Sequence, residues 1–160
     1  MKKLVSVIIP AYNHENYILE CLESVINQTY VNMQLIIVND GSQDDTERII
    51  NEYIENKNFD NIEFYSKENE GLCKTINFGL KKVKGDYVAI LASDDLWKSD
   101  KIERQVSFLE ENKNIALVYS DTYIIKGGVS IKEWTQEMKY KHDKLLILEN
   151  SFEDMVKYNE

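Results

Sequence analysis

Apolar and polar positions along the chain follow two periods, one typical of buried strands and one typical of helices. Short runs rich in Val, Ile and Leu cover residues 4–10, 34–38 and 87–91, with a weaker run at 62–65. Between these runs, apolar residues recur every three or four positions, which gives a helix one buried side. The pattern therefore predicts strands and helices in regular alternation from the start of the chain.

The alternation continues with a helix whose Ile102, Val106 and Leu109 face inward, and with a fifth strand at 115–119. Such an order predicts an α/β fold with a mainly parallel central sheet, right-handed crossovers and helices on both faces. After about Tyr123 the pattern loosens into a polar stretch, and residues 145–158 are predicted to form one amphipathic helix that could cover a sheet edge. We expect a domain over residues 1–123, followed over residues 124–160 by an irregular stretch and a C-terminal helix that begin another part.

Two local details follow from the same pattern. Ser42 and Asp45 have the spacing of a capping box at the start of the second helix. In the third helix, one apolar stripe is expected to face the core, and it consists of Leu72, Ile76, Leu80 and Val83.

Composition narrows the classes of function. The 160 residues include 28 acidic and 19 basic side chains, a formal net charge of -9. No basic stripe is present to neutralise phosphates, which excludes nucleic acid as an expected partner. The cysteines, Cys21 and Cys73, have no metal-ligand or redox spacing, and no run is long enough for a signal or membrane segment. We therefore expect a reduced, cytoplasmic compartment.

Acidic or polar residues close three of the predicted strands. Tyr12-Asn13 follows the first strand, Asp40 the second, and Asp94-Asp95 the fourth. In an open parallel sheet these loops converge on the rim where ligands bind. Glycine-rich phosphate loops of the usual kinds are missing from the sequence. An anionic ligand at this rim would need a metal ion or backbone N–H groups.

These residue types suggest a nucleotide site. The Tyr12 ring can stack on a base and Asp40 can accept an N–H from the base edge. Asp94 can hold ribose hydroxyls while Asp95 binds Mg²⁺ or Mn²⁺, which prefer carboxylate oxygens. Simpler interpretations remain open: Tyr12 as a packing aromatic, Asp40 as a turn former, and the acidic pair as the cap of the next helix. His14 is expected to be solvated, close to the pocket loop.

Three segments together resemble the family 2 glycosyltransferases with the A-type fold: residues 5–13, residues 36–42, and residues 85–97 with Asp94-Asp95-Leu96-Trp97. The resemblance implies transfer of a sugar, with inversion, from a nucleotide diphosphate donor, most commonly a UDP-sugar, to a glycan or lipid-linked acceptor. It implies that Pro10, Ala11 and Tyr12 line the base pocket, that Asp40 contacts the base and Asp94 the ribose, and that Asp95 binds the metal. Lys74 and Asn77 fall where relatives place polar residues facing the donor, although Ile76 stands where many carry arginine.

One part of the family pattern has no counterpart in the sequence. Relatives use an acidic general base from a later segment, and Asp121 is the one carboxylate near the rim that comes into question. We expect that base beyond Glu160, in a longer protein that could also associate peripherally with the inner face of the membrane. The alternative is a non-catalytic nucleotide-sugar-binding module that needs a partner or a further segment. A flavodoxin-like nucleotide-binding domain is a weaker alternative, because it does not explain Asp40 and Asp94-Asp95 together.

Overall fold

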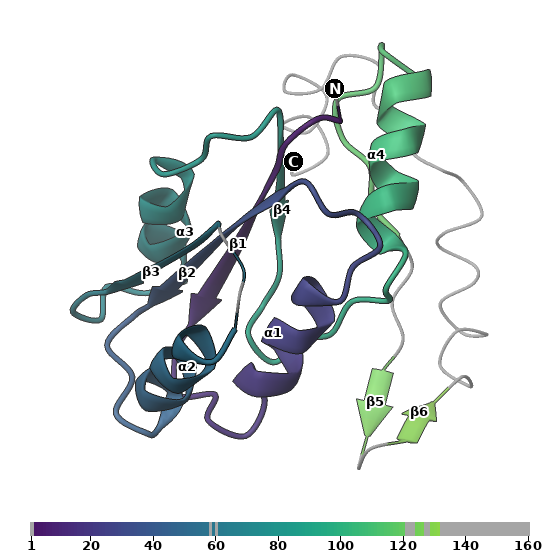
Figure 1. The fold of residues 1–160 in the computed structure, drawn as a ribbon. Helices are drawn as coiled ribbons and strands as arrows, with labels where there is room; N and C mark the ends of the chain where they lie inside the picture. Colours follow the sequence, from purple (N-terminus) through teal and green to yellow (C-terminus); the bar gives the residue numbers. More distant parts are fainter. Residues whose placement is uncertain (1, 58, 60, 121–123, 127–128, 132–160) are drawn as a thin grey trace, which may run out of the picture. The chain divides into compact units, whose positions relative to one another are not determined.

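The computed structural model of the chain describes residues 2–57, 59, 61–120, 124–126 and 129–131 (Figure 1). The chain divides into two compact units, residues 1–104 and residues 105–160. The first unit carries the sheet and the loops of interest. The boundary that the sequence suggests near residue 123 stays a prediction.

A four-stranded parallel sheet in the order β3-β2-β1-β4 forms the centre of the first unit. Its strands are β1 (Val5–Ala11), β2 (Met33–Asn39), β3 (Ile62–Ser66) and β4 (Tyr87–Ile90). Every residue of β1 and β2 is buried, as their mostly apolar runs predict for strands covered on both faces. The predicted parallel α/β fold is confirmed.

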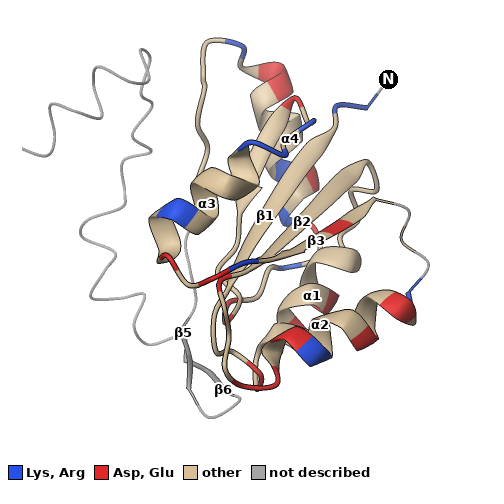
Figure 2. Ribbon diagram, turned by 90° about the vertical axis from the view of Figure 1, so that its left-hand side faces the viewer, with Lys and Arg blue, Asp and Glu red and all other residues tan. Residues whose placement is uncertain are grey.

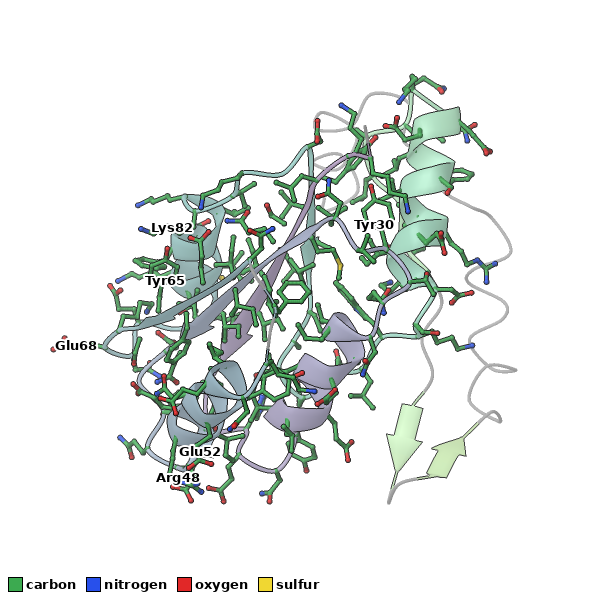
Figure 3. The ribbon with its side chains drawn as sticks, viewed as in Figure 1. Tyr30, Arg48, Glu52, Tyr65, Glu68 and Lys82 are labelled. Carbon is green, nitrogen blue, oxygen red and sulfur yellow. The ribbon has the colours of Figure 1, made fainter. Side chains whose placement is uncertain are left out.

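Helices cover both faces of the sheet. Helices α1 (Ile18–Ile26) and α2 (Thr46–Glu55) lie on one face, and α3 (Leu72–Leu80) lies on the other (Figure 2). Under α3, one cluster joins Ile8 of β1 to Ile36 and Val38 of β2. Tyr65 packs edge-on against Phe78 at this face, and Lys82 lies over the Tyr65 ring (Figure 3).

The third helix faces the core differently from the prediction. Its buried residues are Thr75 and Gly79, whereas Leu72 and Leu80 are exposed. A Cβ atom at Gly79 would lie 2.7 Å from Cγ2 of Ile8, so the missing side chain lets the helix backbone approach the strand. This close approach turns the apolar stripe that starts at Leu72 partly away from the sheet.

The chain beyond β4 departs further from the prediction. Helix α4 (Lys101–Glu111) forms with Ile102, Val106 and Leu109 buried, as expected. Residues 115–119 form no strand, so that prediction is wrong; a short antiparallel ribbon follows instead, of β5 (Ile124–Lys126) and β6 (Val129–Ile131). The helix predicted at 145–158 lies outside the described residues. Among the residues described, no helix is long and apolar enough to span a membrane.

Candidate functional site

The polar loops after β1, β2 and β4 leave the same edge of the sheet. These strands are neighbours, with β1 in the middle, and all run in the same direction. Asn13, Asp40 and Asp94 therefore begin loops at one rim, as the sequence predicts for an open parallel sheet.

The loops after β1 and β2 are locked together by reciprocal hydrogen bonds. The Asn13 N–H donates to Ser42 Oγ (3.0 Å), and Asn13 Oδ1 accepts the N–H of Gln43 (2.8 Å). A second set joins Glu15 to the other loop: the Glu15 N–H donates to Asp44 Oδ2 (3.0 Å), and the Asp45 N–H donates to the Glu15 carboxylate (2.9 Å). Asn13 has a φ of 52°, a left-handed conformation that asparagine tolerates better than most residues. The two loops are thus a single preformed wall of the rim.

Ser42 does not cap a helix. Helix α2 starts at Thr46 with Asp45 as its N-cap residue, whose side chain makes no cap hydrogen bond; the Thr46 N–H donates to Asp44 Oδ1 (3.0 Å). The Ser42 hydroxyl donates instead to Asn39 Oδ1 (2.5 Å) and accepts from Asn13. The capping-box prediction is wrong because the Ser42 side chain is committed to joining the two loops.

Asp40 is buried, with 4% of its surface exposed, and its carboxylate is surrounded by donors. Oδ1 accepts Lys67 Nζ and the N–H of Glu70 (3.0 Å), and Oδ2 accepts the N–H of Gly71 (2.9 Å). Burial alone would raise the pKa of Asp40, but these hydrogen bonds outweigh it and hold the pKa below its usual range. Asp40 is therefore a charged residue that fixes the loop between β3 and α3. A residue that only formed a turn would not need these contacts.

Ion pairs extend from Asp40 to the start of α3. Lys67, whose side chain is 14% exposed, also lies 3.4 Å from the Glu70 carboxylate, and Glu70 pairs with Lys74 Nζ at 3.2 Å. Lys74 and Asn77 are exposed on α3. Lys67 and Glu70 have no motif that would have singled them out, since each is one charged residue in a charged segment.

The acidic pair lies in a turn and does not start a helix. The Asp95 N–H donates to the Ala92 carbonyl (3.0 Å), and α4 begins only at Lys101. The interpretation of Asp94 or Asp95 as the cap of the next helix is therefore wrong. Burial raises the pKa of Asp95, and the neighbouring Asp94 raises it further. The same two carboxylates, after the effect of its own burial, help to raise the pKa of Cys21 to about 12.

His14 joins the first loop to the acidic turn. Its Nδ1 lies 2.7 Å from Ser93 Oγ, and its Nε2 lies 3.9 Å from Asp94 Oδ2. Ser93 is buried, and His14 is itself mostly buried, which corrects the expectation of a solvated ring. The clue in the sequence was position, because His14 directly follows the motif that ends in Asn13.

The residues expected to line a base pocket differ in exposure. Pro10 and Ala11 are buried within β1, and the Ala11 carbonyl accepts the N–H of Asp40 (2.8 Å). Tyr12 is 42% exposed at the end of the strand. Its ring is therefore available to a ligand, and it does not belong to the core.

The rim can bind a divalent cation only if a bound nucleotide supplies further oxygen atoms to coordinate it. Among the described residues, no three His, Cys, Asp or Glu side chains gather as a metal-binding group. Asp95 is a hard oxygen donor whose negative charge is disfavoured by its surroundings. A cation that also bound phosphate oxygens would offset that charge and complete its coordination shell.

Comparisons with known proteins bear on the family of the chain. The family model described as Glycosyl transferase family 2 matches residues 6–158. An uncharacterized glycosyltransferase of Rickettsia typhi is 38% identical over 89% of this chain, which spans 44% of that relative.

Two similar solved structures contain nucleotide sugars. Staphylococcus aureus TarS in complex with UDP-GlcNAc is 31% identical with a TM-score of 0.62, over 68% of this chain and 32% of that one. The Pyrobaculum calidifontis mannosyltransferase in complex with GDP-Man and Mn²⁺ is 26% identical with a TM-score of 0.64, over 68% of this chain and 33% of that one. The chain thus spans less than half of each of these proteins. It belongs to the family 2 glycosyltransferases and has their A-type fold.

Proposed function

We propose that the rim formed by the loops after β1, β2 and β4 binds a nucleoside diphosphate sugar, in the first instance a UDP-sugar. The observation that carries the proposal is a pair of acidic sites on the two strands that flank β1: a buried charged Asp40 after β2 and the Asp94-Asp95 turn after β4. The nucleotide sugars bound by TarS and by the mannosyltransferase support the choice of ligand.

The base side of the proposed site uses preformed groups. The exposed Tyr12 ring offers a face for stacking, next to the chain segment Pro10-Ala11. Asp40 Oδ2 accepts one N–H, from Gly71, and a carboxylate oxygen can accept a second donor such as a base N–H. Lys74, held near the rim by Glu70, is suited to the diphosphate or the sugar.

The phosphate side depends on Asp94 and Asp95. We assign Asp94 to the ribose hydroxyls and Asp95 to a divalent cation, Mn²⁺ or Mg²⁺. When bound, the cation would neutralise charge that develops on the diphosphate leaving group. Asp95 would hold the cation from a turn that directly follows β4, in which its N–H donates to the Ala92 carbonyl.

In the proposed reaction, an acceptor hydroxyl attacks the anomeric carbon from the side opposite the diphosphate. The new C–O bond forms as the bond to the diphosphate breaks, which inverts the configuration. The hydroxyl proton passes to a general base that we place beyond Glu160, and Asp121 lies outside the described residues. The acceptor we propose is a glycan or lipid-linked saccharide. We further propose that residues 1–123 form the donor-binding domain and that the protein acts in the cytoplasm.

The experiment is calorimetric titration of UDP and GDP into the chain, with Mn²⁺, with Mg²⁺ and with EDTA. Metal-dependent binding of UDP is the expected result. Glu52→Ala, which removes an exposed carboxylate paired with Arg48 on α2 (Figure 3), is the matched control and should bind as the unaltered chain does. Absence of binding for both nucleotides under every condition would overturn the proposal.

A further inference from the structure

We propose that His14 is a positioning residue that orients Asp94 for contact with the donor ribose. The proposal rests on the proposed function, because Asp94 is assigned there to the ribose hydroxyls. The motif comparison that identifies Asp94 does not include His14.

The imidazole ring is held on several sides. The backbone N–H of His14 donates to Thr46 Oγ1 (2.8 Å), and Thr46 is fully buried at the start of α2. The Tyr17 ring packs edge-on against the imidazole with centroids 6.0 Å apart. The locked loops after β1 and β2 therefore fix the backbone from which the ring projects, and Tyr17 restricts its rotation.

The hydrogen bond with Ser93 fits the tautomer that the proposal requires. A serine hydroxyl can donate to an unprotonated Nδ1, which leaves the ring hydrogen of a neutral histidine on Nε2. Nε2 is the atom that faces Asp94 Oδ2 at 3.9 Å. This distance is too long for a hydrogen bond, but rotation of the half-exposed Asp94 side chain would close it.

In this arrangement the two adjacent carboxylates, Asp94 and Asp95, have different roles. An N–H directed at Asp94 draws that carboxylate toward the loop after β1, away from the like charge of Asp95. Asp94 then presents one oxygen to His14 and the other to a ribose hydroxyl, and Asp95 stays available to the cation. His14 thus acts on the nucleotide through Asp94, and it needs no change in its own charge to do so.

Substitutions of His14 can distinguish the contact that Nδ1 makes with Ser93 from the contact of Nε2 with Asp94. Asn at position 14 can hydrogen-bond Ser93 but cannot reach Asp94, whereas the longer Gln can place an N–H near the position of Nε2. We expect UDP affinity, measured by calorimetry with Mn²⁺, to fall about fivefold to tenfold in His14→Ala and His14→Asn. His14→Gln should recover most of the lost affinity.

The ribose provides a readout that a purely structural role would not change. In the unaltered chain, UDP should bind more tightly than 2′,3′-dideoxy-UDP, and this difference should shrink in His14→Ala. Equal losses of affinity for the two nucleotides, or no loss for either, would overturn the positioning role. If the unaltered chain binds neither UDP nor GDP, the proposed function fails, and His14 loses the ribose role that depends on it.

A measurement without nucleotide tests the geometry separately. The ¹⁵N NMR signals of His14 should show the hydrogen on Nε2 in the unaltered chain and a mixture of tautomers in Ser93→Ala. A hydrogen resident on Nδ1 in the unaltered chain would overturn the proposal whatever the binding data show.

Discussion

Asp40 follows β2 and Asp95 follows β4, the two strands that flank β1 in one sheet, yet the surroundings of the two carboxylates are opposite. Asp40 is buried among an ammonium group and backbone N–H donors, and its pKa is held low. Asp95 lies beside a second carboxylate, and its pKa is raised by burial and by that neighbour. The protein itself neutralises the first charge and leaves the second one uncompensated.

This difference indicates which half of the rim is complete before a ligand arrives. The base side is preorganised, since Asp40, the locked loops and the start of α3 hold one another in place. In the acidic turn, Asp94 and Asp95 repel each other, and a bound cation would offset that repulsion. Substitutions of Asp40 and of the residues that lock the two loops should therefore lower stability, whereas substitutions in the acidic turn should lower binding alone.

The largest expected effect on stability is that of Asp40→Ala. The substitution leaves the Lys67 ammonium, with 14% of its side chain exposed, without its buried counter-charge and removes the acceptor of two N–H groups. We expect the free energy of unfolding in urea to fall by about 3 kcal/mol. Asp45→Ala, which removes an exposed carboxylate paired with Arg48, should leave it nearly unchanged. If the two substitutions lowered the free energy of unfolding equally, Asp40 would contribute no more to stability than an exposed carboxylate does.

A second prediction concerns the aromatic ring at the end of β1. Tyr12→Ala should weaken UDP binding about tenfold, because base stacking on an aromatic side chain contributes about 1–3 kcal/mol. Its melting temperature should hardly change, since the ring is 42% exposed. Tyr12→Phe keeps the stacking face and should bind UDP as the unaltered chain does. A large fall in stability for Tyr12→Ala would instead assign the ring to the core.

A third prediction tests how rigid the wall formed by the first two loops is. Asn13→Ala loses the hydrogen bond from Gln43 and strains a backbone with a φ of 52°. The free energy of unfolding should fall by about 1–2 kcal/mol. Asn13→Gly loses the same hydrogen bond without the strain, so denaturant midpoints should rank it between the Ala variant and the unaltered chain. The reverse order would show that the left-handed conformation costs little.

The smallest expected effect lies away from the rim, at Glu63 of β3. Hydrogen bonds from Lys84, Gln34 and Tyr65 lower the pKa of Glu63 to about 2. Since this folded-state pKa lies below the unfolded value, the carboxylate adds stability above about pH 4.5 that is lost as the pH falls toward about 2. Lys84 is 67% exposed, which limits the contribution to about 1 kcal/mol. Glu63→Gln should flatten the acid limb of a plot of unfolding free energy against pH, and an unchanged acid limb would contradict this assignment.

The sequence predicts those parts of the fold that depend on local pattern. The runs that form β1 and β2 are mostly apolar, and the acidic pair after β4 is conspicuous because two adjacent carboxylates are costly to bury. The orientation of α3 was missed because it depends on Gly79 meeting Ile8, a contact between residues far apart in the sequence. The apolar run at 115–119 has strand-like composition, yet composition alone cannot supply a pairing partner.

The site was predictable to a similar extent. Asp40, Asp94 and Asp95 follow strands, and strand ends are visible in the sequence. The neighbours of these carboxylates are less visible, since Lys67 beside Asp40 comes from the loop after β3 and His14 near Asp94 comes from the loop after β1. No spacing rule connects such residues, because their proximity follows from the order of strands in the sheet.

The most direct test of the central claim is the affinity of Asp95→Ala for UDP with and without Mn²⁺, measured beside its free energy of unfolding. The account predicts an unaltered or slightly raised stability together with the loss of metal-dependent binding, by about thirtyfold or more, which corresponds to roughly 2 kcal/mol. Unchanged metal-dependent affinity in Asp95→Ala would contradict the account and remove the acidic turn from the donor site.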